Sequence, residues 1–176
     1  MLLSLGSVRG NCRFLHQGLE LLDRLPAEVY RNTSRPGWAP VGSQFRHVLD
    51  HYRGFLLGRS SGCIDYDARP RDRRIETDPA EAAGVMASIL ESLEQIQVHE
   101  ADHQVTIKMD SGGDSGVPDW SASTIGRELQ FLSSHTVHHY ALIKVLLEDA
   151  GVGTSADFGV APSSLAHERG VLEAHR

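Results

Sequence analysis

The side chains best suited to chemistry are two histidines four residues apart, His135 and His139, in a segment with a helical pattern of apolar residues. At about 100° per residue, both fall near the centre of the apolar face of that helix. Glu128 points the same way two turns earlier. Two imidazoles and a carboxylate that face a protein core are costly unless something satisfies them. Because residues i and i+4 lie one above the other on a helix, the histidine pair can chelate one divalent metal ion.

A second helical segment offers the remaining imidazole. His47 and His51 are also four residues apart, and His51 lies nearer the apolar face of its helix. We therefore expect His51 to complete a metal site with His135 and His139, and His47 to lie at its rim. His138 falls at the edge of the apolar stripe. Whether His47 or His138 also binds the metal is left open by this pattern.

Three neutral imidazoles leave coordination positions open, which is typical of catalytic sites rather than structural ones. Zinc is the expected metal because it is borderline soft and widely available, and Ni²⁺ and Fe²⁺ are alternatives. Glu128 is the candidate for proton transfer, because at roughly 10 Å along the helix it lies too far to bind the same ion. The alternative for Glu128 is an ion pair with Arg127 or with an arginine of another helix. The histidines, in turn, could be hydrogen-bonded core residues without a metal.

Helices must position these residues, and apolar side chains recur at helical spacing in four segments. The predicted helices run from Asn11 to Tyr30, from Ser43 to Gly58, from Thr77 to Ile96 and from Ser123 to Asp149. Pro26 is expected to kink or break the first of them. Residues 105–109 alternate between apolar and polar types and predict one short strand.

Four long amphipathic segments with little strand predict an all-α protein, a four-helix bundle with at most a minor short strand. The connections after the second and third helices are long, which permits crossovers. A chain of 176 residues is expected to form a single domain over residues 1–176. Its core is expected at about residues 10–150, with a C-terminal cap at residues 151–176.

Two further groups of polar residues need an interpretation. Asp65, Tyr66 and Asp67 lie in a polar loop that either covers the mouth of the site or forms a solvated turn. Asp50 points about 100° away from His51 around the helix and is therefore expected at the surface.

The composition argues against several classes of function. The formal net charge is −6, and the arginines at 69–74 are interrupted by Pro70 and Asp72, so no nucleic-acid partner is expected. No segment approaches the roughly 20 apolar residues of a membrane span. Cys12 and Cys63 are far apart in sequence, which favours reduced thiols and a cytoplasmic protein.

The order and spacing of the histidine motifs resemble the DinB/YfiT-like metalloenzyme superfamily. Residues 45–52, Phe-Arg-His-Val-Leu-Asp-His-Tyr, resemble its first motif, and residues 134–143, Ser-His-Thr-Val-His-His-Tyr-Ala-Leu-Ile, resemble its second. The resemblance covers the chain from the first helix to about residue 150. It implies a four-helix bundle of up-down-down-up topology with a three-histidine divalent metal site. The ligands that it implies are His51, His135 and His139.

The resemblance indicates the fold and the metal more closely than the reaction. It implies a metal-dependent enzyme, either a thiol S-transferase or a hydrolase, whose metal binds and activates a thiolate or a water molecule. The implied partners are a small-molecule substrate and a low-molecular-weight thiol such as bacillithiol, and a homodimer through an exposed helix face is expected. The first alternative is a non-catalytic, stress-related bundle that binds a metal or another ligand. The second is a helical interaction protein without a metal.

Overall fold

The computed structural model describes residues 6–33, 35–110, 112 and 120–174, and it describes side chains as far as residue 168. Residues 1–5 and 175–176 of the predicted domain therefore lie outside the described residues. The helices in the described part are α1 (Gly6–Arg24), α2 (Ala27–Arg31), α3 (Val41–Arg59), α4 (Arg73–Thr77), α5 (Pro79–Glu94), α6 (Ile125–Asp149) and α7 (Pro162–Ala174), with a 3-10 turn at Val98–Glu100. The strands are β1 (Cys63–Asp65), β2 (Gln104–Lys108) and β3 (Trp120–Thr124). The predominantly helical fold predicted from the sequence is confirmed.

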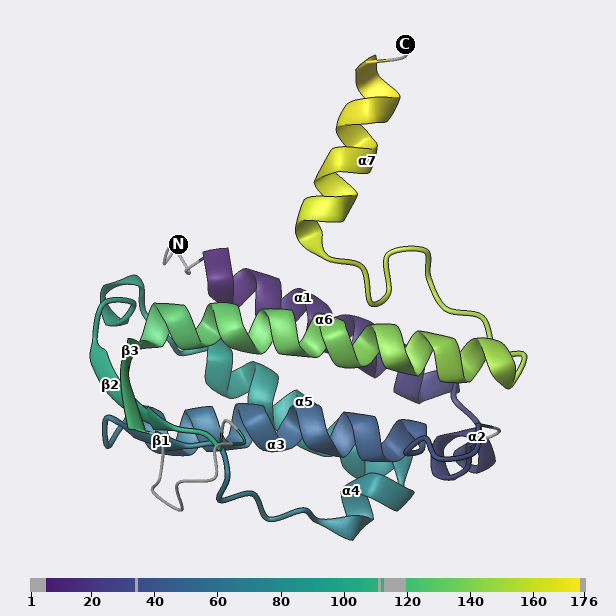
Figure 1. The fold of residues 1–176 in the computed structure, drawn as a ribbon, viewed down its shortest axis with the longest axis horizontal. Helices are drawn as coiled ribbons and strands as arrows, with labels where there is room; N and C mark the ends of the chain where they lie inside the picture. The colour runs from purple at the N-terminus through teal and green to yellow at the C-terminus, as the bar shows by residue number, and fades with distance from the viewer. Residues whose placement is uncertain (1–5, 34, 111, 113–119, 175–176) are drawn as a thin grey trace.

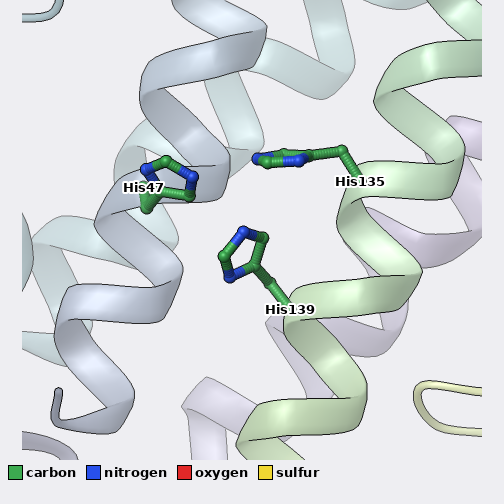
Figure 2. A group of neighbouring side chains, drawn as sticks. All are labelled: His47, His135 and His139. Atoms are coloured by element: carbon green, nitrogen blue, oxygen red, sulfur yellow. The ribbon is translucent and has the colours of Figure 1, made fainter. Parts of the chain in front are cut away.

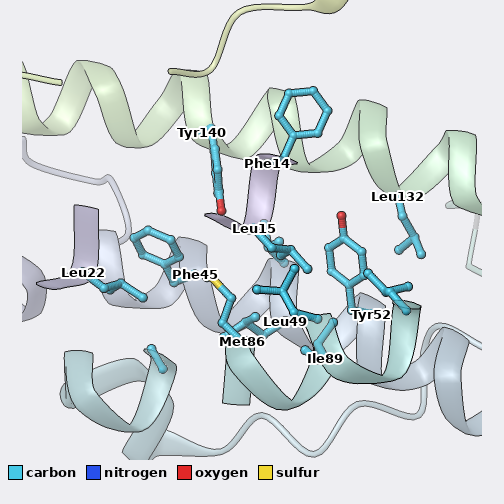
Figure 3. Close-up of a cluster of buried hydrophobic side chains, with 14 of the residues drawn as sticks. Phe14, Leu15, Leu22, Phe45, Leu49, Tyr52, Met86, Ile89, Leu132 and Tyr140 are labelled. Atoms are coloured by element: carbon cyan, nitrogen blue, oxygen red, sulfur yellow. The ribbon is translucent and has the colours of Figure 1, made fainter. Parts of the chain in front are cut away.

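The four long helices α1, α3, α5 and α6 pack around a common core (Figure 1). Both α1 and α3 contact α5 as well as α6. Each of the four helices contributes buried apolar side chains, because each carries such residues at helical spacing on one face. Figure 3 shows the centre of this core, which includes Phe14, Leu15, Leu22, Phe45, Leu49, Tyr52, Met86, Ile89, Leu132 and Tyr140. The up-down-down-up order of the helices stays a prediction.

Local sequence signals mark the ends of several helices. Thr124 accepts a hydrogen bond from the backbone N–H of Arg127 at the start of α6. Asp78 caps α5 in the same way, and Pro79 occupies the first turn, where its missing N–H costs nothing. Pro26 separates α1 from α2, so the predicted break of the first helix is confirmed.

The sheet is larger than the single short strand that the sequence predicts. β2 confirms the strand predicted at 105–109, displaced by one residue, and it pairs with β1 in parallel and with β3 in antiparallel orientation. β1 has only three residues and lies far from β2 in sequence, and β3 has only small and polar residues after Trp120, so local apolar alternation reveals neither strand. The sheet lies at one end of the long helices (Figure 1), and β3 leads directly into α6.

The C-terminal segment ends in α7, which extends away from the other helices (Figure 1). The cap at residues 151–176 stays a prediction. The segment before α7 is held against α6 by Phe158, whose ring stacks on Tyr140 with 4.6 Å between the ring centroids. None of the helices in the described ranges combines the length and the apolar composition needed to cross a membrane.

Asp50 is buried, and its expected place at the surface is wrong. Only 1% of the residue is exposed, and its Oδ2 accepts a hydrogen bond of 3.2 Å from Nη1 of Arg46, one turn earlier on α3. The helix packs against α4, α5 and α6, so more than its apolar face is covered. A helical-wheel angle alone therefore does not identify the exposed side of α3.

Candidate metal centre

Three imidazoles from two helices meet between α3 and α6 (Figure 2). His47 projects from α3 toward His135 and His139 on α6, and one ring nitrogen from each of the three lies within 4.8 Å of the other two. Because Zn–N bonds are about 2.0–2.1 Å long, two nitrogens on one tetrahedral zinc ion are about 3.4 Å apart. At most a small movement of the side chains therefore brings these three nitrogens onto one ion.

His51 lies one turn after His47 on α3, beside the same group. Its ring centroid is 4.1 Å from that of His135 and 4.5 Å from that of His47. In the described part of the chain, ring contacts join His47 to both His135 and His139, but of these two they join His51 only to His135. The cluster thus contains four imidazoles. The ligand set of His51, His135 and His139 stays a prediction, and His138 is exposed.

The Nε2 atom of His135 is buried and has no hydrogen-bond partner among the described residues. A buried polar atom without a partner is costly. The ring of His135 packs against Phe131 and the other imidazoles of the cluster, and its centroid is 4.1 Å from that of His51, 4.5 Å from that of His139 and 5.0 Å from that of His47. A divalent cation would satisfy this nitrogen, and the surrounding donor set fits such an ion.

Hydrogen bonds fix the tautomer of two of the rings. Nδ1 of His139 donates to Oε1 of Gln44 at 2.7 Å, and Nδ1 of His51 donates to the backbone carbonyl oxygen of His47 at 2.9 Å. Since the proton is on Nδ1, the Nε2 atom of each ring keeps its lone pair for a metal.

In the hydrogen bond to His47, the ring nitrogen Nδ1 is the acceptor and not the donor. Nη1 of Arg69 donates to Nδ1 of His47 at 2.7 Å, because a guanidinium has no acceptor. The neutral ring then carries its proton on Nε2. His47 can therefore bind a metal only after Arg69 releases Nδ1.

Burial keeps the imidazoles of the cluster neutral. Burial and, to a smaller extent, the neighbouring histidines lower the pKa of His47 to about 3, of His135 to about 2 and of His139 to about 4. The pKa of His51 is also lowered, again chiefly by burial. Neutral imidazole is the form that binds metals, so at neutral pH no proton has to leave these rings.

Glu128 is buried, and among the described residues it binds hydroxyl groups and not an arginine, which was the alternative to a role in proton transfer. Its Oε2 accepts a hydrogen bond from the hydroxyl of Tyr66 at 2.8 Å, and its Oε1 accepts one from Oγ of Ser123 at 2.5 Å. The ring of Tyr66 in turn stacks on His51, with 5.5 Å between centroids and 25° between planes. Tyr66 therefore covers one side of the cluster, and it links Glu128 to His51.

Two residues that contact the cluster were missed from the sequence. Gln44 lies three residues before His47, so the i, i+3 rule could have placed it on the same face of α3. Arg69 lies in the loop between β1 and α4, and no local pattern predicts its contact with a helix that ends ten residues earlier in the chain.

Comparisons with known proteins found a family model and a curated relative that match parts of the chain. The family model of the DinB superfamily matches residues 15–143, which include every histidine of the cluster. A curated protein of Rhizopus delemar named FK506-binding protein 5 is 30% identical over 104 residues, which make up 59% of this chain and 27% of that protein. The chain thus spans about a quarter of the length of that relative.

Proposed function

Because the chain belongs to the DinB superfamily, we propose that it is a metal-dependent enzyme whose active centre is the histidine cluster between α3 and α6. The observation that carries this proposal is the buried Nε2 of His135, which has no partner among the described residues and belongs to a ring that packs against the other imidazoles of the cluster. We propose zinc as the ion, with Ni²⁺ and Fe²⁺ as alternatives, in a four-helix bundle of up-down-down-up topology.

His135, His139 and one imidazole of α3 would hold the ion. We favour His47 as the third ligand because its ring contacts both histidines of α6. His51 is the alternative, since its Nε2 already carries a free lone pair. Three imidazoles leave at least one position of a tetrahedral ion open to a ligand, as in catalytic zinc sites.

When bound, the ion lowers the pKa of a thiol or a water molecule and so makes a nucleophile available near neutral pH. The residues of the chain orient and shield the site. Gln44 fixes the ring of His139, and Tyr66, braced by Glu128, covers one side of His51. We propose thiol S-transfer or hydrolysis of a small molecule in the cytoplasm, with a low-molecular-weight thiol as the partner in the first case.

A second candidate function is non-catalytic metal binding. The observation that favours it is the presence of both His47 and His51 beside His135. Four imidazoles would fill the coordination shell of a tetrahedral ion and leave no position for a substrate.

The metal content of the full chain, expressed without a histidine tag and measured by mass spectrometry, tests the proposal. We expect about one ion per chain in the wild type and almost none in the double variant His135→Ala, His139→Ala. The control is His138→Ala, which removes an exposed imidazole beside His139 and should keep the ion. A wild type without metal after incubation with Zn²⁺, Ni²⁺ and Fe²⁺ would contradict the proposal.

The two candidate functions differ in their response to an added thiol. If a coordination position is open, a thiol added to the cobalt(II)-loaded protein produces a thiolate-to-cobalt absorption band. A closed four-imidazole shell leaves the cobalt spectrum unchanged and supports the non-catalytic candidate.

A further inference from the structure

Arg69 is a cation at the edge of the histidine cluster. Its Nη1 donates to Nδ1 of His47 at 2.7 Å, and its Nε is buried without a hydrogen-bond partner among the described residues. A guanidinium group carries a full positive charge in proteins. A neutral imidazole is a poor partner for a full positive charge, so the donors of Arg69 are only partly satisfied.

Four carboxylates around this part of the fold are paired with other cations, and Oδ1 of Asp67 accepts a hydrogen bond of 3.2 Å from the backbone N–H of Asp110 instead. The pairs are Asp65 with Lys108 at 3.0 Å, Asp72 with Arg74 at 2.8 Å, and Asp50 and Glu76 with Arg46 at 3.2 and 3.5 Å. Between the described residues, no ion pair joins Arg69 to a carboxylate. An anion from outside the chain is therefore the partner that would complete the hydrogen bonds of Arg69.

The loop that carries Arg69 is ordered by its own hydrogen bonds. Oδ1 of Asp65 accepts from the backbone N–H groups of Asp67 and Ala68 at 2.9 and 3.1 Å, while Lys108 of β2 holds Oδ2. The backbone N–H of Arg69 donates to the carbonyl oxygen of Asp67 at 2.8 Å. A cation on a preordered loop loses less conformational entropy when it binds a ligand.

Metal binding makes this cation more available. One nitrogen of a neutral imidazole must carry the proton, so His47 cannot accept a hydrogen bond from Arg69 while it also gives a lone pair to a metal. An ion bound by His47 therefore releases Nη1 of Arg69, next to the unpaired Nε. If His51 binds the ion instead, Nε remains the available donor.

We propose that Arg69 binds a carboxylate of the small molecule that occupies the open coordination position of the metal centre. Guanidinium and carboxylate match in geometry and form two parallel charged hydrogen bonds. The inference rests on the proposed function and adds the chemical class of its ligand, which is a thiol or a substrate that carries a carboxylate.

Two small thiols test the inference. The cobalt(II)-loaded full chain is titrated with mercaptoacetate and with 2-mercaptoethanol, which differ by a carboxylate in place of a hydroxymethyl group. The thiolate-to-cobalt absorption band gives a Kd for each thiol, and the ratio of the two Kd values measures the preference for the carboxylate. The ratio is compared between the wild type, Arg69→Gln and Arg71→Gln. Arg71 is an exposed residue of the same loop, so its variant removes an equal charge as the control.

We expect the preference for mercaptoacetate to fall roughly tenfold in Arg69→Gln, as for the loss of a charged bidentate contact, and to persist in Arg71→Gln. Arg69→Lys keeps the charge but not the fork of donors, and its preference should lie between those of the wild type and Arg69→Gln. Circular dichroism checks the fold of each variant. If Arg69→Gln does not fold, the comparison of Arg69→Lys with the wild type decides the question.

An equal preference in the wild type and Arg69→Gln would mean that the carboxylate chelates the metal directly. That result overturns the inference and leaves the proposed function standing. The absence of a cobalt–thiolate band in the wild type would contradict the proposed enzyme, and the inference would fall with it.

Discussion

The hydroxyl group of Tyr66 donates a hydrogen bond of 2.8 Å to Oε2 of Glu128, and the same ring stacks on His51. Burial and the nearby carboxylate of Glu128 raise the pKa of Tyr66 above its ordinary value, so the hydroxyl keeps its proton. The bond joins the end of β1 to the first turn of α6. We therefore expect Glu128 to act on the histidines by positioning Tyr66.

Tyr66→Phe should lower the free energy of unfolding but leave the metal affinity almost unchanged. The variant leaves the buried Glu128 with one hydroxyl partner, so the free energy of unfolding should fall by about 1–3 kcal/mol. Cobalt affinity should change little, because the stacking on His51 is kept. Urea denaturation of the metal-free protein and cobalt titration measure the two effects.

A Glu128→Gln variant with unchanged stability and no catalytic activity would instead assign proton transfer to Glu128.

His47→Ala should weaken cobalt binding more than His51→Ala does. Loss of a direct ligand should exceed the roughly 10–100-fold loss typical of an outer hydrogen-bonding partner. Titration with cobalt(II), followed by its absorption spectrum, compares the two variants under the same conditions. The reverse order would assign the third ligand to His51, as the sequence predicts.

Arg69→Gln provides an independent check on the same question. If His47 is a ligand, removing the guanidinium that competes for its Nδ1 should raise cobalt affinity by roughly threefold to tenfold, the value of one hydrogen bond. The gain should vanish in the His47→Ala background. A gain that survives there would show that Arg69 acts through its charge alone.

Gln44→Ala should reduce metal affinity about 10–100-fold, because Gln44 fixes the ring of His139 through a 2.7 Å hydrogen bond. Gln130→Ala serves as the control, since Gln130 is exposed on α6. Competition with a chelator of known affinity measures both variants. Equal affinities for the two variants would mean that the helix alone orients His139.

The metal-free protein should lose stability as the pH falls below about 6.5, the ordinary pKa of histidine. In the folded state burial lowers the pKa of His47, His135 and His139 to about 3, 2 and 4, so the unfolded chain takes up protons first. The contribution of these residues is complete above pH 6.5 and is lost as the pH falls toward the folded values. Thermal unfolding between pH 7.5 and 5 measures the slope, which should be shallower in His135→Gln. Identical slopes would rule out this origin.

The helical half of the site could be predicted because its signals are local. Apolar periodicity runs through α6, and the spacing of His135 and His139 places both on one face. The third ligand was harder to predict, because an angle on a helical wheel gives the direction of a side chain but not its reach. The surface position predicted for Asp50 from such an angle was wrong, because α3 is packed on several sides.

Contacts between distant segments could not be predicted. β1 has three residues and pairs with a strand about forty positions later, so no local alternation marks it. Tyr66 is 62 positions from Glu128, and Arg69 is 22 positions from His47. Such contacts follow from the packing of the whole chain. They are made by single residues that belong to no recognisable sequence motif.

The histidines of the cluster stand on α3 and α6, whereas Arg69 stands on a loop that Asp65 fastens to Lys108 of the sheet. Insertions or substitutions in that loop leave the spacing of the imidazoles untouched. Retention of an ion and choice of a ligand can thus diverge separately in evolution. For a protein engineer, the segment between β1 and α4 is the place to graft a new specificity onto an unchanged set of metal donors.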